Sequence, residues 1–594
     1  MKSKGVINDG VSLGQLLEFE VVFPEEKLIE PEEYLAGGSK DFILNVASAF
    51  LGFKNQNSKF DNPKEFLEML FSIENNDFAN SVYQKIKEVE AREKKVGIIN
   101  PISSLQLFET FFQRESERVT QTSAQFEVNL LKAYLALNSK FTEAQKLAFT
   151  SIKELGNDLK IPMMLFCMYY PASDKLNYSI KEMWVTQTIK AIYLFQFLES
   201  HTRTQPLLET FLNEFRCNSW QDYLKSLLPV TMAAIRNENE AHTDIIVTRD
   251  DKFEESCAFL EKLIVREDDE LDEYDFLTLR SQPFYKVEEG VYRIIFNLFV
   301  IEKIFKGAYF LLREANNKLP KAQKIKEFKS FYGGEFSEKV LLYKVMNSIY
   351  SGKAAVRFTG KELDDKNISG APDYYVRQGR DIILIESKDF LIPKEAKMSF
   401  DFSRYEEEFE KKLYFYNDKG EKKPKAVLQL IYNIKRLLQK QFEADTSYHY
   451  REAAIYPVLL TYDHQYDTPG FNSLINSWFQ FELDALQEEG FYTRRIKPLI
   501  VVNIDSLIFH QVGLQRSFSL QYILKMYADH IRIHKGKTFT SLKEKEIYYL
   551  SRFIPFSGFI DKFFHKVGLV ELPPILEILG PALFKEDYYG KIKG

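Results

Sequence analysis

Three charged residues, Asp373, Glu386 and Lys388, have the types and spacing to bind a metal ion and a phosphate group. Two carboxylates repel each other and lose hydration when they are buried together, unless a hard divalent cation lies between them. Mg²⁺ or Mn²⁺ suits such oxygen ligands and also binds substrate phosphate. A bound ion can activate water, and a lysine can stabilise the charge that develops on a phosphodiester. The chemistry predicted from these residues is therefore phosphodiester hydrolysis.

The segment around these residues is predicted to form two strands joined by a tight turn. The turn is expected at Gln378-Gly379, and the apolar run that follows it is typical of a central strand. Side chains alternate between the faces of a strand, so Glu386 and Lys388 should point the same way and Ser387 the opposite way. Antiparallel pairing across the turn should bring Asp373 beside Glu386 and Lys388. We therefore expect all three charged residues at one edge of a sheet.

Pro372-Asp373 followed by Glu386-Ser387-Lys388 resembles the motif of the PD-(D/E)XK nuclease superfamily. The restriction-endonuclease-like core of that superfamily is a helix, a three-stranded meander, a second helix and a further strand. The resemblance implies that Asp373 and Glu386 bind the metal ion, that the backbone carbonyl of Ser387 adds a ligand, and that Lys388 is the catalytic lysine. It also implies an accessory acid on the helix before the meander. Glu338 is the candidate for this additional catalytic and metal-binding residue.

The residues around the motif follow the order of this core. We expect an α/β fold, with a mixed sheet flanked by helices, over residues 330–510. The predicted elements are a helix around Glu338, a first strand at residues 354–358, a second core helix at residues 426–438, and later strands at residues 453–461 and 498–502. Residues 391–423 exceed what the core requires, so we expect an insertion there.

Several polar residues near the motif are candidates for contacts with nucleic acid. Lysine and arginine side chains neutralise phosphates, and this makes binding sensitive to salt. The candidates are Arg377 and Arg380 beside the predicted turn, Lys422, Lys423 and Lys425 in a lysine-rich run, and Gln429 on the second core helix. A solvent-exposed loop is the alternative interpretation of the lysine run, and exposure at a turn is the alternative for the two arginines.

The rest of the chain is predicted to be mainly helical. Residues 1–275 have apolar residues at the three- and four-residue spacing of helices, and an acidic run at residues 267–273 predicts a boundary. Residues 276–329 are expected to form a hairpin and a helix that lead into the core, and residues 511–594 a helical C-terminal region. The large N-terminal region is expected to sense an activating signal, to recruit a partner, or to restrain cleavage.

Composition limits the class of protein. The 594 residues are too many for one hydrophobic core, and apolar residues make up 45% of them. A net charge of -6 confines any contact with nucleic acid to a local surface. The three cysteines include no CxxC pair, which argues against a disulfide framework or a cysteine zinc site. With no secretory signal and no bilayer-spanning stretch, we expect a cytoplasmic protein without a membrane partner, and a homo-oligomer is compatible with the sequence.

Together these features predict a Mg²⁺-dependent endonuclease or other phosphodiesterase that acts on nucleic acid, with DNA favoured over RNA. By analogy, a large helical region beside a smaller nuclease core suits a restriction-like or phage-defence nuclease. A protein partner or an activating signal would then act through the N-terminal region. One alternative is a repair or recombination nuclease that works with a separate helicase, since the chain has no ATP-binding loop of its own. The other is a scaffold or binding protein whose nuclease fold is catalytically silent.

Overall fold

The computed structural model of the chain describes residues 14–52, 62–91, 95–115, 118–150, 152, 155–176, 178–236, 242–267, 269, 271, 275–534, 537–573, 576 and 580. Both ends of the chain and part of the predicted boundary at residues 267–273 lie outside these residues. Within them the protein is mostly helical, and its strands form four sheets. None of the described helices has the length and apolar character needed to cross a bilayer.

The largest sheet has five strands and is mixed. Its order is β12-β11-β8-β7-β6, with β6, β7 and β8 antiparallel and β8, β11 and β12 parallel. The strands are β6 (Val356–Thr359), β7 (Tyr374–Gln378), β8 (Asp381–Lys388), β11 (Ala454–Thr461) and β12 (Ile500–Asn503). The expected meander is therefore present, and the α/β class holds for this part of the chain.

Helices cover both faces of this sheet. Such cover is needed because β8 has apolar side chains on both of its faces. Ile382 and Leu384 belong to the hydrophobic cluster formed with α22 (Ala426–Leu438) and α23 (Phe471–Glu488). Ile383 and Ile385 belong instead to the cluster on the opposite face. That face is covered by the π-helical segment η4 (Tyr332–Leu342), α18 (Tyr343–Ile349), α26 (Leu520–His530) and α28 (Phe556–Val567). Glu386 and Lys388 continue the alternation of Ile382 and Leu384.

The expected insertion, residues 391–423, is ordered. It contains α20 (Lys394–Lys397), α21 (Phe402–Phe409), η5 (Glu410–Tyr414) and a hairpin of β9 (Phe415–Asp418) and β10 (Glu421–Pro424). The lysine-rich run therefore forms the second strand of a hairpin. Lys419 and Gly420 both have positive φ at its turn, where glycine is strain-free and other residues are uncommon.

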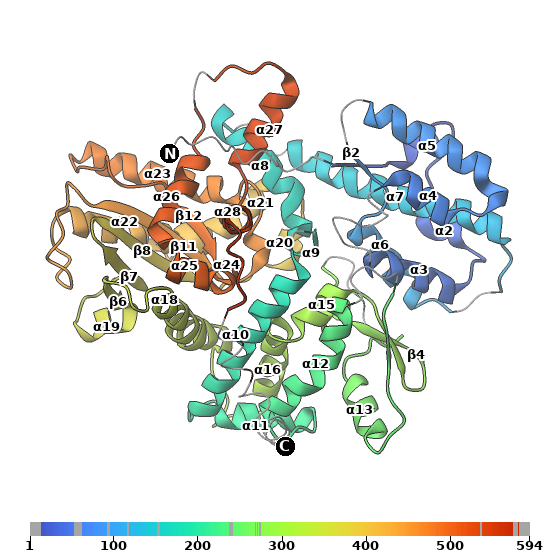
Figure 1. Ribbon diagram of the computed structural model, residues 1–594, viewed down its shortest axis with the longest axis horizontal. Helices are drawn as coiled ribbons and strands as arrows, with labels where there is room; N and C mark the ends of the chain where they lie inside the picture. The colour runs from blue at the N-terminus through green and yellow to red at the C-terminus, as the bar shows by residue number, and fades with distance from the viewer. Residues whose placement is uncertain are drawn as a thin grey trace.

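The N-terminal region is built almost entirely of helices, and Figure 1 shows its first helices in blue on the side of the molecule away from the five-stranded sheet. Its only strands among the described residues before β3 are β1 (Gly14–Leu16) and β2 (Lys95–Gly97), which pair in parallel. Its helices are α1 (Phe19–Val22), α2 (Pro31–Leu35), α3 (Lys40–Gly52), α4 (Pro63–Leu70), η2 (Ile73–Asn75), α5 (Asn76–Glu90), α6 (Pro101–Phe112), α7 (Ser123–Thr150), α8 (Asn157–Tyr169), η3 (Tyr170–Ala172), α9 (Ser173–Leu176), α10 (Ile180–Ser200), α11 (Gln205–Glu214), α12 (Trp220–Arg236) and α13 (Phe253–Leu260).

The expected hairpin at residues 284–296 is part of a three-stranded sheet. β3 (Asp244–Ile246) pairs with β5, and this contact was not predicted because the two segments are far apart in the sequence. The segment contains α14 (Leu277–Ser281), β4 (Phe284–Glu288), β5 (Val291–Ile294), α15 (Asn297–Glu302), α16 (Lys306–Lys318) and α17 (Phe328–Phe331). The remaining elements are α19 (Gly360–Asp365), η6 (His464–Tyr466), α24 (Ile504–Phe509), α25 (Gln511–Arg516) and α27 (Leu542–Arg552).

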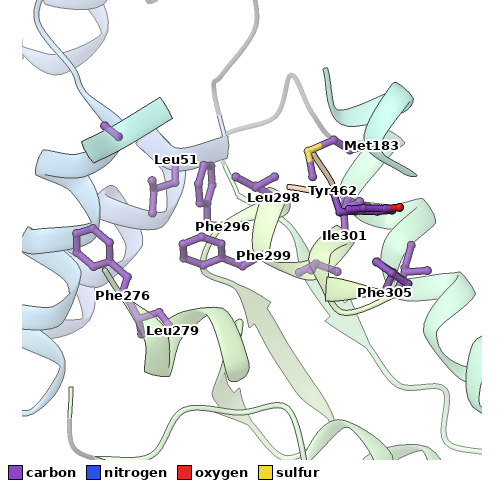
Figure 2. Packing of buried hydrophobic residues seen from close by; sticks show 14 of the residues in the cluster. Leu51, Met183, Phe276, Leu279, Phe296, Leu298, Phe299, Ile301, Phe305 and Tyr462 are labelled. Carbon is purple, nitrogen blue, oxygen red and sulfur yellow. The ribbon is translucent and has the colours of Figure 1, made fainter. Parts of the chain in front are cut away.

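Helix α15 lies at the centre of the molecule and is buried along its whole length. Figure 2 shows Phe296, Leu298 and Phe299 near Leu51 of α3, and Ile301 near Tyr462, which follows β11. A single hydrophobic cluster therefore contains residues from the N-terminal helices, the lead-in segment and one face of the five-stranded sheet. Residues 1–275, 276–329 and 330–510 share a core.

A buried ionic cluster adds to this connection. Lys397 of α20 is 2% exposed, and its Nζ lies 3.0 Å from carboxylate oxygens of both Asp174 and Asp275. Burial alone would raise the pKa of Asp174, but the charges of Arg280, Lys175 and Lys397 outweigh it and hold the pKa well below its ordinary value. The insertion is thus tied to the N-terminal region by charges that must stay paired.

Candidate active site

The edge of the sheet where β7 begins and β8 ends brings the predicted residues together. Tyr374 pairs with Ile385, so Asp373 reaches the level of Glu386. The backbone N–H of Ser387 donates a hydrogen bond to Asp373 Oδ2 at 2.7 Å. This contact fixes the direction of the Asp373 side chain toward the end of β8.

Glu386 is a buried carboxylate that lies beside Lys388. Its side chain is 1% exposed, and Lys388 Nζ lies 3.5 Å from Oε2. Oε1 is buried and accepts no hydrogen bond from the described residues. Burial, and then the charge of Asp373, raise the pKa of Glu386 well above its ordinary value. An unsatisfied buried carboxylate oxygen is costly, and a bound cation would remove that cost.

Lys388 retains its charge in this environment. Burial acts to lower the pKa of the ammonium group, but the carboxylates of Glu386, Asp373 and Glu338 outweigh burial and raise the pKa overall. A charged lysine beside two strand-end acids can hold a phosphate oxygen or stabilise the negative charge that forms during hydrolysis.

Glu338 reaches the same site from η4. Its Oε1 accepts a hydrogen bond from the hydroxyl of Tyr343 at 3.3 Å, and that hydroxyl accepts one from the backbone N–H of Lys361 at 3.1 Å. Burial, and then the charge of Asp373, raise the pKa of Glu338 to about 7. The π-helical backbone around it is a rare conformation that occurs often at functional sites.

Two glycines shape the backbone around Asp373: Gly360 allows a close approach, and Gly370 allows a turn. The N–H of Gly360 donates to the carbonyl of Asp373 at 2.8 Å, and a Cβ at Gly360 would lie only 3.2 Å from the Cα of Asp373. Gly370 has a φ of +66°, which turns the chain before Pro372, and its carbonyl accepts a hydrogen bond from the Asn433 side chain at 2.9 Å.

The donor set suits a hard divalent cation. Asp373 and Glu386 offer carboxylate oxygens, and Mg²⁺ needs only one or two such ligands because it keeps several waters. The described residues include Glu338, Asp373 and Glu386, but their carboxylate oxygens do not all lie within 4.8 Å of one another. The charge of Asp373 acts on both Glu386 and Glu338, so the three acids belong to one electrostatic cluster.

The predicted nucleic-acid residues divide into two groups, and the first lies beside the site. Burial, followed by the charges of Lys388, Lys412 and Lys423, lowers the pKa of Lys425, so these lysines lie near one another. Gln429 is one helical turn further along α22, and its buried Oε1 accepts no hydrogen bond from the described residues. Elsewhere on β10, Lys422 Nζ lies 4.0 Å from the centre of the Phe415 ring, and Lys423 is paired with Asp418.

The two arginines of the second group lie at the opposite end of the strands. Arg377 Nε is 2.6 Å from Asp445 Oδ2, and this buried carboxylate also accepts a hydrogen bond from the Tyr375 hydroxyl. Arg380 is exposed and lies 3.2 Å from Glu452. Arg377 therefore has a structural partner, and neither arginine is near Asp373.

A basic groove beside the site was not predicted. It has a volume of about 730 Å³ and is lined by Arg313, Lys321, Lys324, Lys326 and Lys329, with Glu327 as the only acid in its lining. Lys329 of this lining has its Nζ 2.5 Å from Asp389, the residue that follows Lys388. The density of lysine between residues 318 and 329 is a signal in the sequence that could have found it.

Tyr343 was also missed, although its position five residues after Glu338 in a helical segment could have indicated it. Comparisons of the chain with models of protein families, with curated proteins and with solved structures found no match.

Proposed function

We propose that the protein is a Mg²⁺-dependent nuclease whose active site contains Asp373, Glu386, Lys388 and Glu338. The observation that carries this proposal is Glu386, whose buried and unsatisfied oxygen lies beside a charged lysine and an oriented aspartate. An ion pair between Lys388 and Glu386 with a purely structural role would not need a second acid, Asp373, beside it. A cation and a phosphate would use all of these groups.

Each residue has a distinct part in the proposed reaction. Asp373, Glu386 and the carbonyl of Ser387 would hold Mg²⁺ or Mn²⁺, which supplies an activated water and neutralises charge on the phosphate. Lys388 orients the scissile phosphate and stabilises the charge that develops on it. Glu338, with a pKa near neutrality, is suited to accept the proton that the attacking water loses.

The strand order supports assignment to the PD-(D/E)XK type. An antiparallel meander is followed by α22 and by β11, which pairs in parallel with β8. The helix before the meander contributes Glu338, and the meander and β8 contribute the other acids. We infer a restriction-endonuclease-like core on the basis of this order and the motif together.

Nucleic acid is the substrate that the surrounding charges favour. The charges of Lys388, Lys412 and Lys423 all act on Lys425, and Lys329 of the basic groove is paired with Asp389, next to Lys388 in the chain. Such surfaces neutralise phosphates along a chain rather than on a single small molecule. We favour DNA over RNA, and a restriction-like or phage-defence role by analogy with nucleases that have large accessory regions.

The test is cleavage of plasmid DNA and of RNA by the full chain with Mg²⁺, Mn²⁺ or EDTA. Wild-type protein should cleave only with metal, and Lys388→Ala should lower the rate by about 100-fold or more, as removal of one group that stabilises the transition state does. Lys353→Ala, which removes a lysine outside the site, is the control. Equal behaviour of the wild type and Lys388→Ala on every substrate would instead favour the silent scaffold.

A further inference from the structure

A second cluster of metal-ligand side chains lies far from the candidate active site in the sequence. Glu182 is in the first turn of α10, and Asp561 and His565 are on consecutive turns of α28. One ligand atom from each of the three lies within 4.8 Å of the others. His565 Nε2 is 3.2 Å from Asp561 Oδ1.

His510, between α24 and α25, lies beside this cluster, although it is not part of the set within 4.8 Å. Its side chain is 4% exposed, and its Nε2 lies 3.7 Å from Asp561 Oδ1, which is too long for a hydrogen bond. The ring stacks on Phe564 with 4.9 Å between centroids and 13° between planes, so its direction is fixed. Asp561 Oδ1 is itself buried and accepts no hydrogen bond from the described residues. A carboxylate oxygen with two imidazole nitrogens around it, and with the carboxylate of Glu182 close by, indicates a site for a cation.

Two of the donor-donor distances around Asp561 are compatible with tetrahedral coordination of zinc. Zinc lies about 2.0–2.2 Å from nitrogen and carboxylate ligands, so neighbouring donors of a tetrahedron are separated by roughly 3.3–3.6 Å. The distances of 3.2 and 3.7 Å from Asp561 Oδ1 to the two histidines lie close to this range. Mixed imidazole and carboxylate donors favour zinc over Mg²⁺, which prefers oxygen alone.

We propose that Glu182, His510, Asp561 and His565 form a zinc site separate from the nuclease site. The side chains of Asp561 and His565 are 33% and 59% exposed, so an ion can reach the site from solvent. Because Glu182 belongs to α10 and the other ligands belong to the C-terminal helices, bound zinc joins the N-terminal region to the part of the chain beside β12. The site stabilises that junction and does not depend on any nuclease activity.

The experiment uses the full chain, treated with chelator and then titrated with Zn²⁺ by calorimetry in the Asp373→Asn background. That background removes a ligand of the candidate nuclease site. We expect one zinc per chain, with affinity at least about 10-fold weaker in His565→Ala. His242→Ala is the matched control, because His242 is also partly exposed and lies 4.0 Å from an aspartate, Asp244.

Co²⁺ gives a second readout, because tetrahedral Co²⁺ absorbs visible light far more strongly than the hydrated ion. The absorption should appear in wild type and His242→Ala and be lost in His510→Ala and His565→Ala. Zinc should also raise the melting temperature of wild type and not that of His565→Ala. Absence of zinc binding by wild type, or equal affinity in wild type and His565→Ala, would overturn the proposal.

Discussion

Asp373 and Ser387 are connected by a hydrogen bond from the backbone N–H of Ser387 to Asp373 Oδ2, which spans the ends of β7 and β8. The bond uses an oxygen of the aspartate and leaves the other for a metal ion. It also means that the carboxylate keeps its orientation before any cation arrives. Preorganised ligands of this kind lower the cost of binding.

Replacement of Asp373 should separate metal binding from folding. In Asp373→Asn the amide oxygen can still accept the bond from Ser387, so the melting temperature without metal should change little. Loss of the negative charge should weaken Mg²⁺ or Mn²⁺ binding by about 10-fold or more, measured by calorimetry. Asp381→Asn, at the opposite end of β8, is the control. Unchanged affinity in Asp373→Asn would remove Asp373 from the metal site.

Glu338 should make the stability of the metal-free protein depend on pH. Its pKa in the folded chain is about 7 against an ordinary value of 4.5, so its contribution to stability is complete below 4.5 and lost as pH rises through 7. Glu338→Gln should therefore melt at a higher temperature than wild type at pH 8 with EDTA, and the difference should shrink at pH 5. Thermal unfolding at pH 8 and at pH 5 measures the two differences in melting temperature. A difference that is the same at both pH values would contradict this origin.

The basic groove should contribute to affinity for nucleic acid without taking part in cleavage. Lys324→Ala combined with Lys326→Ala should weaken binding and reduce the slope of log affinity against log salt by roughly 0.7–0.9 for each phosphate that the groove no longer neutralises. The measurement is fluorescence anisotropy at several salt concentrations. Lys64→Ala combined with Lys85→Ala removes exposed lysines from α4 and α5 and should leave the slope unchanged.

Asp445 should matter for stability because it holds Arg377. Asp445→Ala leaves the Arg377 guanidinium and the Tyr375 hydroxyl without their buried acceptor, and breaking a buried ion pair costs about 3–5 kcal/mol. Chemical unfolding measures this loss. If Arg377 instead contacted nucleic acid, Arg377→Ala would weaken the binding of DNA and leave the midpoint of unfolding unchanged.

The shared core predicts that residues 276–594 do not fold when they are separated from the N-terminal helices. A fragment of residues 276–594 would expose the side of α15 that packs on the N-terminal helices, and it should be insoluble or unfolded by circular dichroism. In the full chain, Phe299→Ala should cost about 3–5 kcal/mol of stability, as expected for a buried phenylalanine. Leu572→Ala, at a side chain 65% exposed, is a control that should cost little.

The geometry of the site was largely predictable because it depends on local rules. Strand alternation placed Glu386 and Lys388 on one side of β8, and the short turn at Gln378-Gly379 set the pairing that brings Asp373 to them. The second core helix has the predicted bounds, residues 426–438, because its apolar spacing and the proline before it are both in the sequence. The roles of these residues remain predictions.

Long-range contacts could not be predicted in the same way. The pairing of β3 with β5, the contact of Lys397 with Asp174, and the position of Asp445 beside Arg377 all join residues far apart in the chain. No periodicity within either segment specifies such a partner. The same reason explains why the sequence did not indicate that one hydrophobic cluster contains residues of several predicted regions.

The burial of α15 between the N-terminal helices and the region of the five-stranded sheet also restricts how such a protein can evolve. Recombination that exchanged one region for that of another gene would leave an apolar helix facing a surface that does not fit it. New specificities would therefore arise by replacement of surface residues, such as the lysines of the basic groove, and not by exchange of whole modules.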